Sequence, residues 1–144
     1  MFSSQLTSAF GRPGGMAHAY RQIGVETSVD SASPHQLISL LFDGYMDALT
    51  LARGAMRQGQ IEAKGKAIGR AARIVEEGLK ASLNLSGGGQ LAQDLHALYE
   101  YLTTRLTLAN LRNDESIVDE CIRLVEPLRQ AWRDIGYQVA ARPN

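Results

Sequence analysis

The side chains that could do chemistry in this chain are few and widely separated. Its three histidines are His18, His35 and His96. A di-iron site in a helical bundle needs Glu-x-x-His pairs on facing helices, so that both side chains point inward. The residues three positions before these histidines are Gly15, Ala32 and Gln93. We therefore expect no metal site and no cofactor.

Nucleophile and phosphate-binding motifs are also missing from the sequence. The single cysteine, Cys121, lies in the apolar stretch VDECIRLV, which indicates a buried, reduced thiol. No nucleophile has a recognisable base beside it. The glycines of SGGGQ follow a predicted helix, and the Lys-Ser/Thr pair of a phosphate loop does not come after them. We therefore predict that the protein is not an enzyme.

The composition favours a single domain whose positive and negative charges balance. The chain has 144 residues, of which 44% are apolar, and its 15 Lys and Arg balance 15 Asp and Glu. This balance argues against recruitment by nucleic acid or by an anionic membrane. No apolar run approaches the roughly 18 residues of a membrane-spanning helix, and the N-terminus lacks the pattern of a signal peptide. We expect a cytosolic protein that does not insert into membranes.

The elements that must position the remaining side chains are helices. Ser33, Pro34 and Gln36 form a helix start, with a cap, a first-turn proline and a capping-box partner. From there the apolar period predicts four helices, over about 34–58, 60–84, 89–112 and 114–137. Short connections between helices of this length are typical of an antiparallel up-down bundle. The predicted fold class is therefore all-α, an antiparallel up-down four-helix bundle with a short N-terminal cap segment.

The chain divides into four parts on this interpretation. Residues 1–18 are rich in Ser and Gly and are predicted to be a flexible tail. Residues 19–32 carry a few apolar anchors and are predicted to form the cap segment. The bundle is expected to span 33–138, followed by a C-terminal tail over 139–144. Pro127 lies inside the last helix and should either kink it or divide it near Glu126.

The helices carry more apolar surface than one core requires. At 100° per residue the apolar arc of the first helix covers roughly 240°, against the ~100° stripe that faces a core. The second helix has a strip of small residues, and the third has a second apolar strip beside its core stripe. One interpretation makes the first helix central and covers the remainder with the N-terminal segment. The other is a groove for an amphipathic or extended partner.

The second interpretation predicts a set of partner-binding residues drawn from the cap and three helices. They are Tyr20, Ile23 and Val25 in the cap, Leu40, Phe42 and Met46 in the first helix, Ala67, Ala71 and Ile74 in the second, and Tyr101, Leu108 and Leu111 in the third.

Three stretches of the sequence resemble the FliS-type flagellin export chaperones. The first, AYRQIGVETSVDSASPHQLISLLFDGYMDAL, contains the family's tyrosine, its Ser-Pro helix start and its aromatic-Asp-Gly motif. The second runs from QGQIEAKGKAIGRAARIVEEGLK to ALYEYLTTRLTLANLRND, and the third is LRQAW. The resemblance covers about residues 19–135. Gln60 and Gln90 depart from an expected Asp and Glu, and Pro127 is unusual for the family.

This resemblance implies a four-helix bundle with the N-terminal segment folded over an apolar surface. It also implies binding to the C-terminal segment of flagellin in the cytosol and delivery to a component of the flagellar export gate. Flagellin's terminal region polymerises when it meets another copy, so a chaperone that covers it would block premature assembly. The alternative is a structural adaptor whose surplus faces pair with a second copy as a homodimer. Neither alternative involves nucleic acid.

Overall fold

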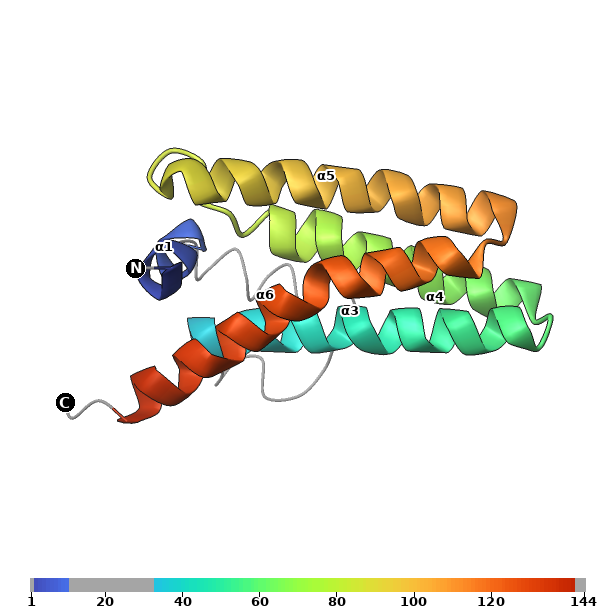
Figure 1. Ribbon diagram of the computed structural model, residues 1–144, viewed down its shortest axis with the longest axis horizontal. Coiled ribbons are helices and arrows are strands. Elements are labelled where there is room, and N and C mark those ends of the chain that lie inside the picture. The colour runs from blue at the N-terminus through green and yellow to red at the C-terminus, as the bar shows by residue number, and fades with distance from the viewer. Residues whose placement is uncertain (1, 11–32, 142–144) are drawn as a thin grey trace.

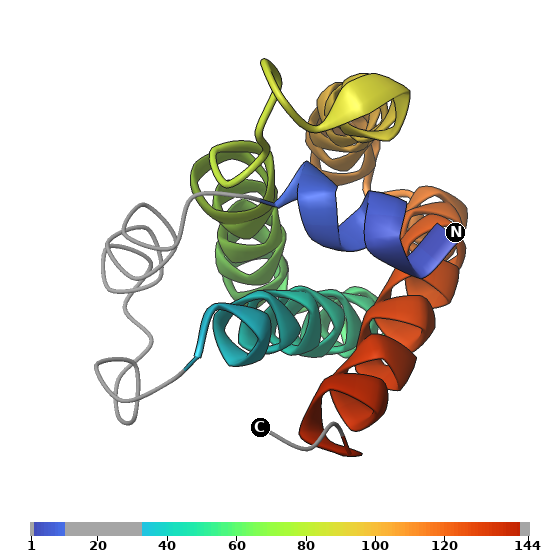
Figure 2. The same cartoon turned by 90° about the vertical axis from the view of Figure 1, so that its left-hand side faces the viewer.

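The computed structural model describes residues 2–10 and 33–141 of the chain. Its elements are α1 (Phe2–Ala9), α3 (Pro34–Arg57), α4 (Ile61–Arg73), which continues into the π-helical η1 (Ile74–Lys80), α5 (Gly89–Arg112) and α6 (Glu115–Ala141). Figure 1 shows the long helices running in alternating directions, and Figure 2 shows them at the corners of a square. The predicted four-helix bundle is confirmed.

The helix boundaries follow capping chemistry that is visible in the sequence. The Gln36 backbone N–H donates to Ser33 Oγ at 3.1 Å, and the Ser33 N–H donates to Gln36 Oε1 at 2.8 Å. The capping box predicted for the start of α3 is therefore confirmed. Asp114 Oδ1 accepts a bond from the Ser116 N–H at 2.9 Å and caps α6. The turn before α4 uses Gly59 at a φ of 69°, a conformation that glycine adopts without strain.

The second helix of the bundle differs from its predicted form. Its regular α-helix ends at Arg73, and the next seven residues form the wider π-helix η1, which ends at Lys80 rather than near residue 84. Ser82 Oγ bonds back to the Gly78 carbonyl at 2.6 Å just after this end. A π-turn rotates all later side chains relative to an α-helical count, because it holds more residues per turn. The π-helical turn still faces the core, because Ile74, Val75, Gly78 and Leu79 are all buried.

The core of the bundle contains the central stripe predicted for α3. Leu37, Leu41 and Tyr45 are buried, and the Tyr45 hydroxyl donates to the Cys121 carbonyl at 2.9 Å. Cys121 is buried and unpaired, as predicted, and burial raises the pKa of its thiol to about 12. The Tyr99 hydroxyl is also buried, and it has no hydrogen-bond partner in the described part of the chain.

The structure differs from two predictions about the ends of the chain. Residues 2–10, predicted to belong to a flexible tail, instead form α1 and Phe10, with Leu6, Ala9 and Phe10 buried against the core. The prediction failed because tertiary contacts, rather than local propensity, hold this short helix. The cap segment 19–32 lies outside the described residues. At the other end, α6 continues to Ala141, three residues beyond the predicted limit of the bundle.

Pro127 bends the last helix without dividing it. α6 is continuous from Glu115 to Ala141, with Pro127 in its interior. In Figure 1 its second half turns away from α5 and slopes across the end of α3. A proline removes one helical hydrogen bond and crowds the preceding turn, which accounts for the change of direction. None of the described helices has the length and hydropathy needed to cross a membrane.

Candidate functional site

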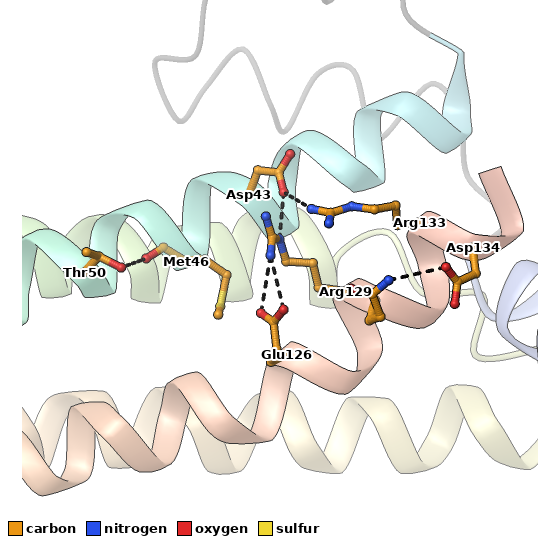
Figure 3. A network of polar contacts seen from close by, with 8 residues as sticks. Asp43, Met46, Thr50, Glu126, Arg129, Arg133 and Asp134 are labelled. Atoms are coloured by element: carbon orange, nitrogen blue, oxygen red, sulfur yellow. Dashed lines mark hydrogen bonds and ion pairs between the residues drawn. The ribbon is translucent and has the colours of Figure 1, made fainter. Parts of the chain in front are cut away.

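Charged side chains bridge three of the four seams between neighbouring helices. Between α3 and α6 they are the pairs Arg57–Glu115, Arg53–Asp119 and Asp43–Arg129, with the closest N···O distances at 2.6, 3.0 and 2.8 Å. Figure 3 shows Arg129 reaching both Asp43 and Glu126, with Arg133 also directed at Asp43. Arg105 pairs with Glu120 across the α5–α6 seam at 2.8 Å. Lys64 donates to the Asn110 carbonyl between α4 and α5 at 3.0 Å.

The fourth seam, between α3 and α4, is closed by small side chains instead. No ion pair between described residues joins these two helices. A Cβ atom placed on Gly44 would lie 3.3 Å from Ile74 Cδ1, so glycine allows the helices to approach closely there. Ala52 and Ala71 are fully buried.

Toward the turn that connects them, α3 and α4 separate into a groove of about 530 Å³. Ten residues line it: Thr50, Leu51, Gly54, Ala55, Gln58, Gln60, Ala63, Lys66, Ala67 and Arg70. A volume between 300 and 1,000 Å³ is typical of a binding pocket. The groove is therefore large enough for a few side chains of a partner, and too small for a whole helix to be enclosed.

The walls of this groove are apolar and its rim is basic. Leu51 is 69% exposed, and a Cβ atom on Gly54 would meet no other atom within 4 Å. Lys66 and Arg70 stand along the α4 side, and the lining contains no carboxylate. A neighbouring hollow of about 480 Å³ shares Gln60, Ala63 and Lys66 with the groove and extends it to Ile61, which is 72% exposed, and to Glu62, which pairs with Lys66 at 3.8 Å.

The chemistry of this surface suits binding. Among the described residues there is no group of three or more His, Cys, Asp or Glu side chains that could hold a metal ion. Exposed apolar side chains beside small ones form a surface that can bury the apolar face of another chain. The basic rim then favours a partner that carries carboxylates next to its apolar residues.

The partner-binding residues predicted from the sequence are dispersed in the structure. Leu40, Met46, Ala67 and Leu108 are half-buried and pack against the core, while Tyr101 and Leu111 are exposed, Leu111 by 82%. Phe42, Ala71 and Ile74 are buried and do not lie at the surface of this arrangement, so their role in partner binding stays a prediction. The helical period shows that they are apolar, but it does not show which of them neighbouring helices will cover. Tyr20, Ile23 and Val25 lie outside the described residues.

The second strip of α5 does not meet the small residues of α4. Tyr101 faces α6, where its hydroxyl donates to Glu120 Oε2 at 2.5 Å. The Arg105 guanidinium lies over the Tyr101 ring, 6.0 Å from its centroid. Hydrogen bonds from Tyr101 and then Arg105 hold the pKa of the Glu120 carboxyl below its usual value. Ala67 lies in the α3–α4 groove, and the two predicted strips therefore belong to different faces.

Two exposed residues, Leu51 of the groove and Ile61 of the neighbouring hollow, are absent from the predicted partner-binding residues. The signal available was position, because both lie near the α3–α4 turn, where the bundle ends and covering neighbours are fewer.

Comparisons with known proteins place this chain in one family. Residues 16–139 match the family model described as flagellar protein FliS. The chain is 47% identical over 118 residues to the flagellar secretion chaperone FliS of Salmonella typhimurium, covering 82% of this chain and 87% of that protein. Identity to FliS of Escherichia coli is 44%, covering 81% and 85% of the two chains. Identity to FliSB of Pseudomonas aeruginosa is 42%, covering 82% and 93%.

Proposed function

The chain belongs to the FliS family of flagellar secretion chaperones, and we propose on that premise that it binds the C-terminal region of flagellin. In this proposal the complex forms in the cytosol, prevents flagellin from polymerising early, and delivers it to a component of the flagellar export gate. The family is one of chaperones, and the protein acts by binding and release rather than by catalysis.

The observation that supports this proposal best is the groove between α3 and α4. It combines the exposed side chain of Leu51 with the small residues Gly54, Ala63 and Ala67. An apolar segment of flagellin can place its side chains there, with Ile61 extending the contact beyond the turn. The other three seams lack this character because ion pairs and charged hydrogen bonds cross them.

The groove supplies an anchor for the client rather than its whole binding surface. A segment that folds as it binds typically buries about 1,000–3,000 Å² and spends about 2–5 kcal/mol on ordering. We propose that the remainder of the client passes over exposed or half-buried side chains on α3 and α5, which include Leu40, Met46, Tyr101, Leu108 and Leu111. The cap residues Tyr20, Ile23 and Val25 compete with it in this proposal, which makes the cap a gate.

The test is calorimetric titration of the full chain with the C-terminal segment of its own flagellin. Leu51→Asp should weaken the affinity about 10- to 100-fold, because burying a leucine is worth about 1.5–3 kcal/mol. Gly54→Leu should weaken it similarly by filling the groove. The matched controls are Leu124→Asp, at an exposed leucine of α6, and Gly69→Leu, where a side chain also meets open space outside the groove. Both controls should bind within about twofold of wild type.

Each result has a separate meaning. If the wild-type chain fails to bind flagellin or to delay its polymerisation, the proposed function is wrong. If it binds but Leu51→Asp and Gly54→Leu behave like their controls, the function stands and the groove is not the anchor. Sedimentation at low protein concentration tests the adaptor alternative, since an obligate oligomer would remain assembled without flagellin.

A further inference from the structure

A helix from outside the family-matched region fills one end of the bundle. The family model begins at residue 16, whereas α1 spans Phe2–Ala9. α6 contains Pro127, and its second half turns away from α5 (Figure 1). α1 contacts both helices, and we call the place it occupies between them the wedge. Figure 2 shows α1 lying across the end of the bundle between them. The wedge is therefore an occupied helix-docking site.

The apolar face of α1 completes an aromatic cluster in this wedge. Leu6 and Ala9 are fully buried, and Phe10 follows them into the core. The Phe10 ring meets Trp132 of α6 edge-on, with centroids 5.4 Å apart, and meets Phe42 of α3 in the same way at 6.4 Å. Edge-to-face pairs at these distances add stabilisation beyond the burial of their area. Without α1, Phe42 and Trp132 would lose this cover.

The backbone of the α1 segment is also engaged. The Asn84 N–H donates to the Ala9 carbonyl at 2.7 Å, and Phe10 and Leu83 form a single antiparallel bridge. A Cβ atom on Gly88 would clash with the Asn84 carbonyl oxygen and lie 2.8 Å from Ala92 Cβ and 3.1 Å from Ala9 Cα, so the backbones of the connection and of α1 approach closely there. The connection between η1 and α5 therefore accepts α1 closely, by backbone as well as by side chains.

Trp132 links α1 to the position of α6. Its indole stacks on the His35 ring at the start of α3, with centroids 4.8 Å apart and planes at 9°. The indole N–H donates to the His35 carbonyl at 3.0 Å, and His35 Nε2 lies 2.7 Å from the Trp132 carbonyl. Phe10, the residue after α1, contacts the same indole ring. The bent half of α6 is thus in contact with both the start of α3 and the α1 segment.

We propose that the α5–α6 wedge is a binding site for a short amphipathic helix and that α1 is its permanent occupant within the same chain. In this role α1 serves as a fifth core helix that fixes the bent half of α6 against α3. The site lies at the opposite end of the bundle from the α3–α4 groove, which adjoins the turn at Gly59 (Figure 1). A partner in the groove therefore has no need to displace α1.

The experiment uses the full chain and the fluorescence of Trp132, its single tryptophan. Leu6→Asp should release α1, shift the Trp132 emission to longer wavelength and lower the Tm by about 5–10 °C. The control is Gln5→Asp, the same charge at the adjacent exposed position, which should leave both quantities unchanged. Phe10→Leu is the milder variant and should move both by a smaller amount, because it keeps an apolar side chain but removes the aromatic contacts.

A synthetic peptide of residues 1–14 then tests the site directly. Added to the Leu6→Asp chain, it should restore the wild-type emission in a saturable titration, whereas the same peptide carrying Leu6→Asp should not. Equal emission and Tm for Leu6→Asp and Gln5→Asp would overturn the proposal. It would also fail if the flagellin segment shifted wild-type Trp132 emission to that of Leu6→Asp, because α1 would then be displaceable. The emission, Tm and peptide measurements require no flagellin, so a failure in them is distinguishable from a failure of the proposed function.

Discussion

The two sides of α3 are built differently. Toward α6 the helix presents Asp43, Arg53 and Arg57, each paired with an opposite charge on α6. Figure 3 shows the pair of Asp43 with Arg129. Toward α4 it presents Gly44, Leu51 and Gly54, and no ion pair between described residues crosses that seam. The charges reverse sign along α3 and along α6, so only one antiparallel register satisfies them. The charged side of α3 therefore determines how α3 and α6 align, while the apolar side leaves exposed apolar surface between α3 and α4.

That division has a physical basis. Exposed ion pairs contribute little net free energy, typically about 0–1 kcal/mol each, but a shifted register would place like charges together. A groove without such pairs presents apolar area and basic side chains that a partner can still use. In the proposed function the chaperone keeps its own fold while part of its surface remains available, and the two sides of α3 would serve these two tasks separately.

The largest change in stability expected from this comparison comes from overpacking the seam between α3 and α4. Ala71 lies one turn after Ala67 and is fully buried. Ala71→Leu should lower the free energy of unfolding by about 1–3 kcal/mol, because the added atoms force α4 away from its neighbours. Urea denaturation measures this. Ala63→Leu, on the exposed wall of the groove, is the matched control and should stay within about 0.5 kcal/mol. Equal changes in unfolding free energy for Ala71→Leu and Ala63→Leu would mean that the α3–α4 seam is loosely packed.

The long helices were predictable because their signals are local. The Ser33 cap, the glycine-rich stretch before α5 and the Asn113–Asp114 pair each mark a boundary by their own backbone chemistry. α1 was missed because its sequence, FSSQLTSA, is short and largely polar. An isolated helix of eight residues is unstable in water, and only contacts with distant residues such as Trp132 hold this one.

The candidate site was only partly predictable, for a geometric reason. A count of 100° per residue shows that α3 is apolar on most of its surface, but it does not show which neighbour covers each part. Phe42 is predicted at a partner surface and is buried, with the Phe10 ring against it, while Leu51 is absent from that prediction and is exposed. Ala71 and Ile74 of the second helix show the same limit, because the count identifies them as apolar but does not show that their neighbours bury them.

A smaller effect is expected from breaking the charged seam. Arg129→Met keeps much of the side-chain volume but removes the pairs with Asp43 and Glu126. These groups are partly exposed, so the loss should be at most about 1 kcal/mol at low salt and should shrink in 0.5 M salt. Arg112→Met is the control, since Arg112 forms no ion pair with a described residue. Flagellin affinity should not change, and a tenfold loss would place the α3–α6 side in the binding surface.

The smallest effect should appear in the pH dependence of stability. Tyr101 and Arg105 lower the pKa of Glu120 in the folded protein. A carboxyl with a depressed folded pKa stabilises the fold above its unfolded value, near 4.3, and this contribution is lost as the pH falls through the folded pKa. Unfolding free energies from pH 7 to 3 should therefore fall less steeply for Glu120→Gln than for wild type.

A variant in the α3–α4 groove is the control for this pH experiment. Its lining contains no carboxylate, so Gly54→Leu fills it without removing a group that titrates between pH 3 and 7. That variant should keep the wild-type pH slope even though it weakens flagellin binding, whereas Glu120→Gln should flatten the slope and leave binding intact. If both variants changed the same quantity, the charged seams and the apolar groove would not be independent parts of the molecule.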